Sequence, residues 1–214
     1  MTRVMVVDDH ELLADSLQAA LTVEGLEVVR PSSFDASVLL AEAAEWSPQL
    51  VLLDLGLPDD QSTLPMVRPL VDLGAKVVMV TAETDRARHA ECVAAGAIGI
   101  VSKTVSFDRL VEVVLDAVAG RPLMTNAERE DLLADLRQRR ADESERLAPF
   151  EKLTEREREV LAGLMQGLAA EALANELFVS MATMRSHIRS ILSKLGVRSQ
   201  LAAVAMAQAA GWTP

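Results

Sequence analysis

Short apolar runs alternate with amphipathic stretches along the first 123 residues of the chain. The apolar runs predict five buried strands, at residues 4–7, 26–29, 50–53, 77–80 and 98–101. The stretches after them repeat apolar residues at helical spacing and predict helices at residues 12–25, 35–45, 64–73, 85–95 and 107–119. This alternation predicts a flavodoxin-like (βα)5 domain, a parallel sheet of strand order 2-1-3-4-5 with helices on both faces. Pro69 lies inside the third helix and is expected to kink or split it.

The rest of the chain repeats its apolar residues at helical spacing only, so the predicted fold class is α/β plus all-α. Residues 126–145 are rich in charge, and three leucines at helical spacing predict an exposed amphipathic helix there. The polar residues 141–146 predict a semi-flexible linker. We therefore expect a domain at residues 1–123, a helical linker at residues 124–148 and a second domain at residues 149–214.

The second domain is predicted to contain four helices. Thr154 and Glu157 form a capping box that starts the first of them. The later helices are predicted at residues 169–177, 181–195 and 200–211. The last helix is apolar nearly all round, so it requires burial on two sides.

Charge is distributed unevenly between the two predicted domains. The 214 residues carry a net charge of −11. Residues 1–125 hold 9 Lys/Arg and 19 Asp/Glu, whereas residues 151–214 hold 7 and 6. An acidic first domain repels nucleic acid, while a basic surface on the second could contact phosphate. The apolar runs are too short to span a membrane, and the single cysteine, Cys92, excludes an internal disulfide, so we expect a cytoplasmic protein.

Polar residues stand at the ends of four of the predicted strands. They are Asp8, Asp9, Asp54, Thr81 and Lys103. Because the carboxyl ends of parallel strands meet at one edge of a sheet, we expect these side chains to share one cleft. Taken singly, each has an ordinary structural interpretation, such as a helix cap or a surface lysine. Carboxylates gathered together favour a bound Mg²⁺, and Asp54 then becomes a nucleophile for a phosphoryl group, with Lys103 and Thr81 beside it.

At these positions residues 1–123 resemble a response-regulator receiver domain. Asp8 and Asp9 match its acid pair, Asp54 its phosphoacceptor, and Thr81 and Lys103 its hydroxyl and lysine. The resemblance implies phosphorylation of Asp54 by a sensor histidine kinase. It also implies Mg²⁺ as the cofactor, held by the three aspartates and the backbone carbonyl of Gly56, which with Pro58 interrupts the backbone after the strand.

Two positions depart from the receiver pattern. Ile100 stands where receiver domains commonly have Tyr or Phe, and a branched aliphatic side chain lacks the polar tip that such a switch uses. Thr104 stands where many relatives have proline, so a cis peptide bond is not expected there. The chemistry of phosphorylation is predicted to be intact, while its transmission across the last two strands is the open question.

The second domain resembles the LuxR-type helix-turn-helix, and the whole chain resembles a NarL/FixJ-type response regulator. Leu153-Thr-x-Arg-Glu, Ser180-x-x-Thr183, His187-Ile188 and Ile191-Leu192-x-Lys194-Leu195 carry this resemblance. The residues predicted at or near DNA are Ser180, Thr183, Met184, Arg185, His187, Arg189 and Lys194. For Met184 packing in the core is an equally good interpretation, and for His187 so is a hydrogen bond to a backbone carbonyl.

The leading hypothesis is a transcriptional regulator in which phosphorylation of Asp54 releases the DNA-binding domain from the receiver domain, or pairs two chains as a homodimer, and so raises affinity for promoter DNA. The second domain has a net charge of only +1, so pairing on two half-sites is expected to supply affinity. One alternative is a regulator of the same fold that a partner or ligand controls without phosphorylation. Another is a Mg²⁺-dependent phosphohydrolase with Asp54 as nucleophile, which requires a cap insertion that the short predicted loops do not supply.

Overall fold

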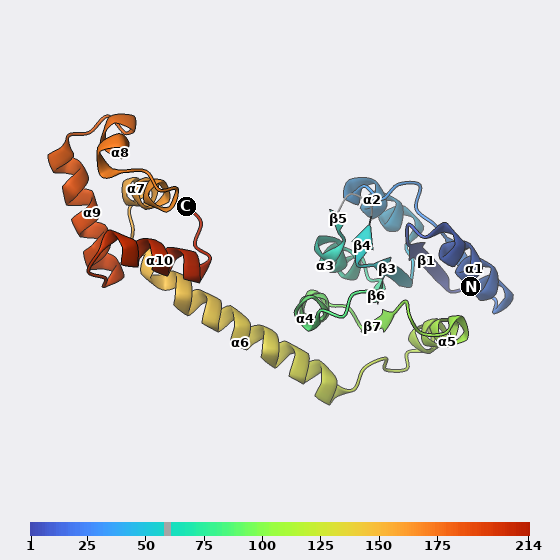
Figure 1. Cartoon of the computed structure of the whole chain (residues 1–214). Coiled ribbons are helices and arrows are strands. Elements are labelled where there is room, and N and C mark those ends of the chain that lie inside the picture. Colours follow the sequence, from blue (N-terminus) through green and yellow to red (C-terminus); the bar gives the residue numbers. More distant parts are fainter. Residues whose placement is uncertain (58–60) are drawn as a thin grey trace. The chain divides into compact units, whose positions relative to one another are not determined.

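The central strand β3 (Leu50–Asp54) is buried along its whole length, as expected for a strand with helices over both faces. In this computed structural model, which describes residues 1–57 and 61–214, five strands form one parallel sheet in the order β2-β1-β3-β6-β7 (Figure 1). The other strands are β1 (Arg3–Val7), β2 (Glu27–Val29), β6 (Lys76–Thr81) and β7 (Gly99–Ser102). When only the five strands of this sheet are numbered in chain order, β6 and β7 become the fourth and fifth strands. The order is then 2-1-3-4-5, and the predicted topology is confirmed.

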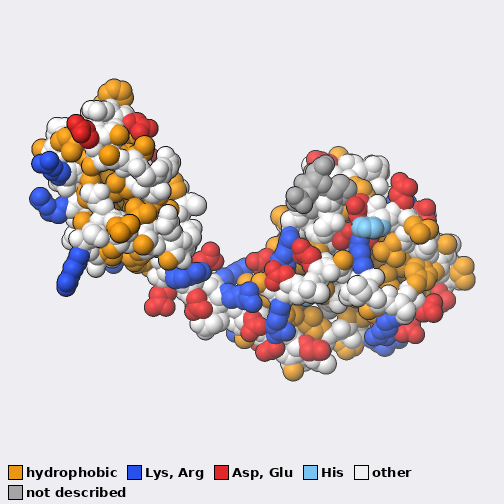
Figure 2. All heavy atoms as spheres, in the orientation of Figure 1, with side chains coloured by type: hydrophobic (Ala, Val, Ile, Leu, Met, Phe, Trp, Pro, Cys, Tyr) orange, Lys and Arg blue, Asp and Glu red, His pale blue; other side chains and the backbone are white. Residues whose placement is uncertain are grey.

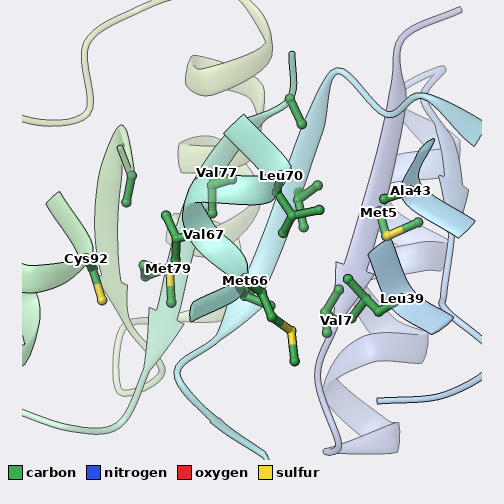
Figure 3. Close-up of a cluster of buried hydrophobic side chains, with 14 of the residues drawn as sticks. Met5, Val7, Leu39, Ala43, Met66, Val67, Leu70, Val77, Met79 and Cys92 are labelled. Carbon is green, nitrogen blue, oxygen red and sulfur yellow. The ribbon is translucent and has the colours of Figure 1, made fainter. Parts of the chain in front are cut away.

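Five helices cover the two faces of this sheet. They are α1 (Glu11–Val23), α2 (Ala36–Trp46), α3 (Leu64–Asp72), α4 (Arg86–Ala95) and α5 (Phe107–Val118). Alternate residues of each strand point to opposite faces, so one core contains Met5 and Met79 with side chains of α2, α3 and α4 (Figure 3). The other contains Val4 and Val78 with side chains of α1 and α5. Both faces of the sheet are covered by buried apolar side chains, so polar chemistry is placed at the strand ends.

The segment after β3 differs from the prediction. A short antiparallel pair forms between β4 (Gly56–Leu57) and β5 (Gln61–Ser62), which no apolar periodicity indicated. Pro58, one of the two predicted backbone breakers, lies outside the described residues. The expected split at Pro69 is wrong, because α3 continues through it and the next turn bonds from Leu73 N to the Pro69 carbonyl.

A long helix, α6 (Asn126–Glu151), connects the two units into which the chain divides, residues 1–137 and 138–214. The predicted semi-flexible linker at residues 141–146 is therefore wrong, since these residues are helical. Ala, Glu and Arg in this segment are good helix formers, so a polar composition does not by itself indicate a break. Leu132 and Leu136 pack in the first unit, and Leu147 and Phe150 pack in the core of the second.

The second unit packs four further helices around one core. They are α7 (Glu155–Met165), α8 (Ala170–Glu176), α9 (Met181–Leu195) and α10 (Gln200–Ala210). The predicted capping box of Thr154 and Glu157 is present at the start of α7, and Ser180 caps α9 by accepting from Thr183 N. Gly196 ends α9 at a φ of 68°, a conformation that favours glycine. In the part of the chain that the structure describes, no helix is long and apolar enough to cross a membrane.

Phe150 stacks on Trp212 with ring centroids 5.5 Å apart and is 1% exposed, so the end of α6 is part of the second core. We predict that Phe150→Ala lowers the free energy of unfolding of this unit by about 3 to 5 kcal/mol, the usual cost of such a cavity. Phe178→Ala is the matched control, because Phe178 is 95% exposed. Urea unfolding followed by Trp212 emission, in a Trp46→Phe background, measures both, and equal midpoints for the two variants would contradict the packing described.

Candidate functional site

The polar strand ends of the first unit meet in a single cleft. Asp8 follows β1, Asp54 ends β3, and Lys103 follows β7. The Lys103 Nζ lies 2.7 Å from Asp54 Oδ2 and 2.8 Å from Asp8 Oδ2, so one ammonium joins two carboxylates from different strands. Three side chains remote along the chain therefore converge, as the parallel topology predicted.

Asp54 is held from several sides and is only 4% exposed. Its Oδ1 accepts a hydrogen bond from Gly56 N at 3.2 Å, and Thr63 Oγ1 donates to its backbone carbonyl. Burial raises the pKa of the Asp54 carboxyl, and the Lys103 ammonium opposes that rise. The carboxylate is thus oriented, with its charge balanced mainly by one lysine.

The Lys103 ammonium has opposing influences on its charge. Burial favours the neutral amine, but hydrogen bonds to Asp54 and Asp8 outweigh it and raise the pKa of Lys103 above its ordinary value. The side chain is therefore a fixed positive charge at the strand ends. It is placed to neutralise an anionic group next to Asp54.

Four side chains in this cleft fit a divalent cation. Asp8, Asp9, His10 and Asp54 each offer one ligand atom, and these atoms all lie within 4.8 Å of one another. Hard carboxylate oxygens are the ligands that Mg²⁺ prefers, so the residues present suit that ion. The sequence prediction missed His10, whose Nδ1 lies 2.8 Å from Asp9 Oδ1; its place directly after the acid pair was the available signal. Gly56 lies beside Asp54, but the proposed ligation through its carbonyl stays a prediction.

Thr81 ends β6 and is buried, with its Oγ1 accepting a hydrogen bond from Glu83 N at 2.9 Å. This bond ties the hydroxyl to the loop that leads into α4. Ile100, on the neighbouring strand, is half-buried and packs against both the sheet core and α6. The hydroxyl is in place at the strand end, while the aromatic switch is replaced by an aliphatic contact.

In the second unit, α8 and α9 form a helix-turn-helix with one exposed basic face. Arg185 and Arg189 are exposed and lie four residues apart on α9. Figure 2 shows Lys and Arg side chains along the side of this unit that α9 forms. Ser186 is also exposed, next to Arg185 and three residues before Arg189, so it lies on the same face of α9 as these arginines.

The other predicted DNA residues differ in how available they are. Ser180 Oγ lies 2.9 Å from Thr183 Oγ1 and accepts from Thr183 N, so both hydroxyls are engaged in the cap of α9. His187 is half-buried. Met184 is fully buried in the core, which matches its packing interpretation and contradicts a base contact. Its position on the apolar stripe of α9 is the physical reason.

Lys194 is held by an internal ion pair. Its Nζ lies 2.6 Å from Glu157 Oε2, and Glu157 is buried between α7 and α9. Although burial alone raises it, hydrogen bonds from Lys194, Ser190 and Thr154 lower the pKa of Glu157 to about 2. Lys194 therefore fixes α9 to α7 in this structure, and a direct contact with DNA stays a prediction.

Comparisons with known proteins match both units. The family model of the response regulator receiver domain matches residues 4–115, and that of the bacterial regulatory proteins of the luxR family matches residues 151–207. The transcriptional regulatory protein LiaR of Bacillus subtilis (strain 168) is 31% identical over 211 residues, 97% of each chain. The probable transcriptional regulatory protein NarL of Mycobacterium tuberculosis is 32% identical over 207 residues, 96% of this chain and 93% of that one. A LuxR-family two-component response regulator from Aurantimonas sp. SI85-9A1 has a solved structure with a TM-score of 0.51 and 26% identity, covering 66% of this chain and 99% of that chain.

A (βα)5 sheet with an acidic cleft, followed by a helix-turn-helix unit, defines a two-component response regulator with a DNA-binding output. The chain belongs to the response-regulator family that joins a receiver domain to a LuxR-type DNA-binding domain. The resemblance stated from the sequence is thus confirmed. This family consists of transcriptional regulators and not of enzymes, so the phosphohydrolase hypothesis has no support.

The Glu157–Lys194 pair yields a pH-dependent prediction. A carboxyl with a lowered folded-state pKa stabilises the fold above its ordinary pKa of 4.5, and this contribution is lost as the pH falls toward about 2. We expect Glu157→Gln to destabilise the second unit by about 2 kcal/mol at neutral pH, with the difference shrinking below pH 4.5.

Thermal unfolding followed by Trp212 emission, in a Trp46→Phe background, measures this effect across the pH range. Glu159→Gln is the control, because Glu159 is an exposed residue of the same helix that pairs with Arg156 at the surface. A Glu157→Gln penalty that stayed constant down to pH 2 would show that charge is not its cause.

Proposed function

We propose that this chain is a DNA-binding response regulator in which a sensor histidine kinase phosphorylates Asp54 and thereby changes promoter binding. The receiver domain comprises residues 1–123, the helical linker residues 124–148 and the DNA-binding domain residues 149–214. The observation that carries the proposal is the single cleft in which Lys103 Nζ lies 2.7 Å from Asp54 Oδ2 beside the acid pair. The matched receiver family supports a kinase as the phosphoryl donor.

The phosphoryl transfer uses the groups of this cleft. A carboxylate oxygen of Asp54 attacks the phosphorus of a phosphohistidine in line; the P–O bond forms as the P–N bond breaks, and the imidazole leaves with the electron pair. Lys103 neutralises one phosphoryl oxygen. Asp8, Asp9 and Asp54 would hold Mg²⁺, and the bound ion would supply positive charge that neutralises the phosphoryl oxygens. Thr81 Oγ1, free to rotate its proton, donates to the transferred group.

The DNA contacts are assigned to the exposed face of α9. Arg185 and Ser186 lie in the first turns, which enter the major groove in helix-turn-helix proteins, and Arg189 follows one turn later. We assign Arg185 to a base edge and Arg189 to a phosphate.

Pairing of two chains adds to this DNA contact. The net charge of +1 over residues 151–214 gives each copy a weak electrostatic attraction to DNA, so a homodimer on two half-sites supplies the affinity. Leu201, exposed on α10, supports this helix as a dimer surface.

We predict that Asp54→Asn abolishes the covalent phosphoryl adduct that a small phosphodonor forms in the presence of Mg²⁺, because the amide is not a nucleophile. Intact mass spectrometry measures the adduct, and fluorescence anisotropy with promoter DNA measures the rise in affinity that accompanies it. Asp72→Asn, an exposed acid on α3, is the control and should retain both responses. A donor-dependent rise in DNA affinity that persists in Asp54→Asn would contradict the proposal.

We predict that Arg185→Ala weakens promoter binding by about 5-fold to 150-fold, since a base-reading arginine contributes roughly 1 to 3 kcal/mol. The loss should be smaller on DNA of unrelated sequence, because only base contacts carry sequence information. Arg158→Ala, an exposed arginine on α7, serves as the control. Anisotropy titrations at two salt concentrations measure these affinities, and an equal loss on both DNA sequences would assign Arg185 to phosphate instead.

A further inference from the structure

The first half of α6 lies against α4 and β7 within the first unit. Leu132 and Leu136 are 8% and 6% exposed on an otherwise charged helix, because they pack on Ala90 and Val93 of α4. Ile100 of β7, Met124 and Leu133 adjoin this cluster. The apolar stripe of this half of α6 thus has a specific partner surface on the receiver unit.

Polar contacts fix the direction of this packing. Arg86 in the first turn of α4 binds Asp131 at 2.5 Å and Asp135 at 2.7 Å, both on α6. At the other end of α4, Arg129 donates to the carbonyls of Val93 and Ala97. The two helices are therefore antiparallel, and Arg86 alone joins the first turn of α4 to α6 through its ion pairs.

A short series of hydrogen bonds and an ion pair connects Thr81 with α4, the helix that carries Arg86. The Oγ1 of Thr81 accepts from Glu83 N, and the Glu83 carbonyl lies 3.1 Å from His89 Nε2 on α4. The Glu83 carboxylate in turn pairs with Arg88 of α4 at 2.9 Å. A displacement of Thr81 toward Asp54 therefore moves the loop that is bonded to α4, together with the turn that carries Arg86.

A cavity of about 560 Å³ gives this turn room to move. Its walls include Thr81, Arg86, Ile100, Met124 and Leu132, so it lies between the strand end and the docked helix. Ile100 is one of the side chains that line this space.

We propose that the first half of α6 is the element that reads the state of Asp54. In the resting chain it is clamped on α4 and β7 by the Arg86 ion pairs and the Leu132–Leu136 stripe. A phosphoryl group on Asp54 draws Thr81 toward it, shifts the first turn of α4 and loosens the clamp. This inference rests on the proposed phosphorylation of Asp54. It assigns to α6 the switch role that an aromatic residue has in other receiver domains, where this chain has Ile100.

The clamp is suited to reversal because its polar part is weak. Arg86 is about half exposed, and its acidic partners are exposed too, so solvent and salt screen these ion pairs. The apolar contact is limited to one helical stripe. A modest shift of α4 is therefore sufficient to change the docked population.

The test compares Arg86→Ala with Arg68→Ala in the full chain. Arg68 also forms an exposed arginine–aspartate pair, with Asp72 on α3, away from α6. Hydrogen exchange of the amides of residues 126–137 is measured with and without a small phosphodonor and Mg²⁺. Phosphorylation of the wild-type chain and the Arg86→Ala substitution should each raise exchange about fivefold or more, while Arg68→Ala should not. The double variant Asp131→Asn/Asp135→Asn removes the same ion pairs from the α6 side, and its exchange at residues 126–137 should match that of Arg86→Ala.

The outcomes separate this inference from the proposed function. If the mass adduct on Asp54 and the donor-dependent DNA binding appear but exchange at residues 126–137 stays unchanged, the clamp is refuted and the proposed function stands. Equal exchange in Arg86→Ala and Arg68→Ala would also refute it. If no adduct forms, phosphorylation control fails, and exchange in Arg86→Ala without donor still decides whether the Arg86 ion pairs hold α6 on α4. Raised exchange both in the phosphorylated wild-type chain and in Arg86→Ala supports the clamp.

Discussion

The ion bridge of Lys103 to Asp54 and Asp8 is the interaction on which the receiver unit depends. It joins the ends of β1, β3 and β7, and it balances buried carboxylates that would otherwise repel each other. The cleft therefore holds charged groups at the edge of an apolar core, and it is stable only while each charge has an opposite charge beside it. A phosphoryl group on Asp54 adds negative charge to this balance and must draw in new partners. The chemistry and the conformational response thus have the same electrostatic origin.

The sequence predicted the strands and helices of the first unit to within a few residues, because buried parallel strands and amphipathic helices have distinct periods. It also predicted the convergence of Asp54 and Lys103, since topology alone brings the strand ends together. It did not predict the β4–β5 pair, whose strands have two residues each. Nor did it predict the grip of Arg86 on Asp131, because a surface contact between residues 45 positions apart leaves no periodic signal.

The two ends of α6 have different environments, and this explains why its composition was misleading. Its middle is charged and solvated, which resembles a linker, while Leu132 and Phe150 anchor opposite ends in separate cores. The helix is therefore defined by packing at its ends more than by its local pattern. In the second unit the same principle applies to Lys194, which the buried Glu157 holds although its position on α9 indicated a role at DNA.

The central claim is that one cleft binds a phosphoryl group through Asp54, Lys103 and Thr81. A crystal structure of the full chain with Mg²⁺ and beryllium trifluoride, which mimics an aspartyl phosphate, tests it most directly. The account predicts the beryllium on an Asp54 oxygen, with Lys103 Nζ and Thr81 Oγ1 each within hydrogen-bond distance of a fluoride. A beryllium trifluoride group bound elsewhere, or a Thr81 hydroxyl still engaged with Glu83 N and remote from the group, would contradict it.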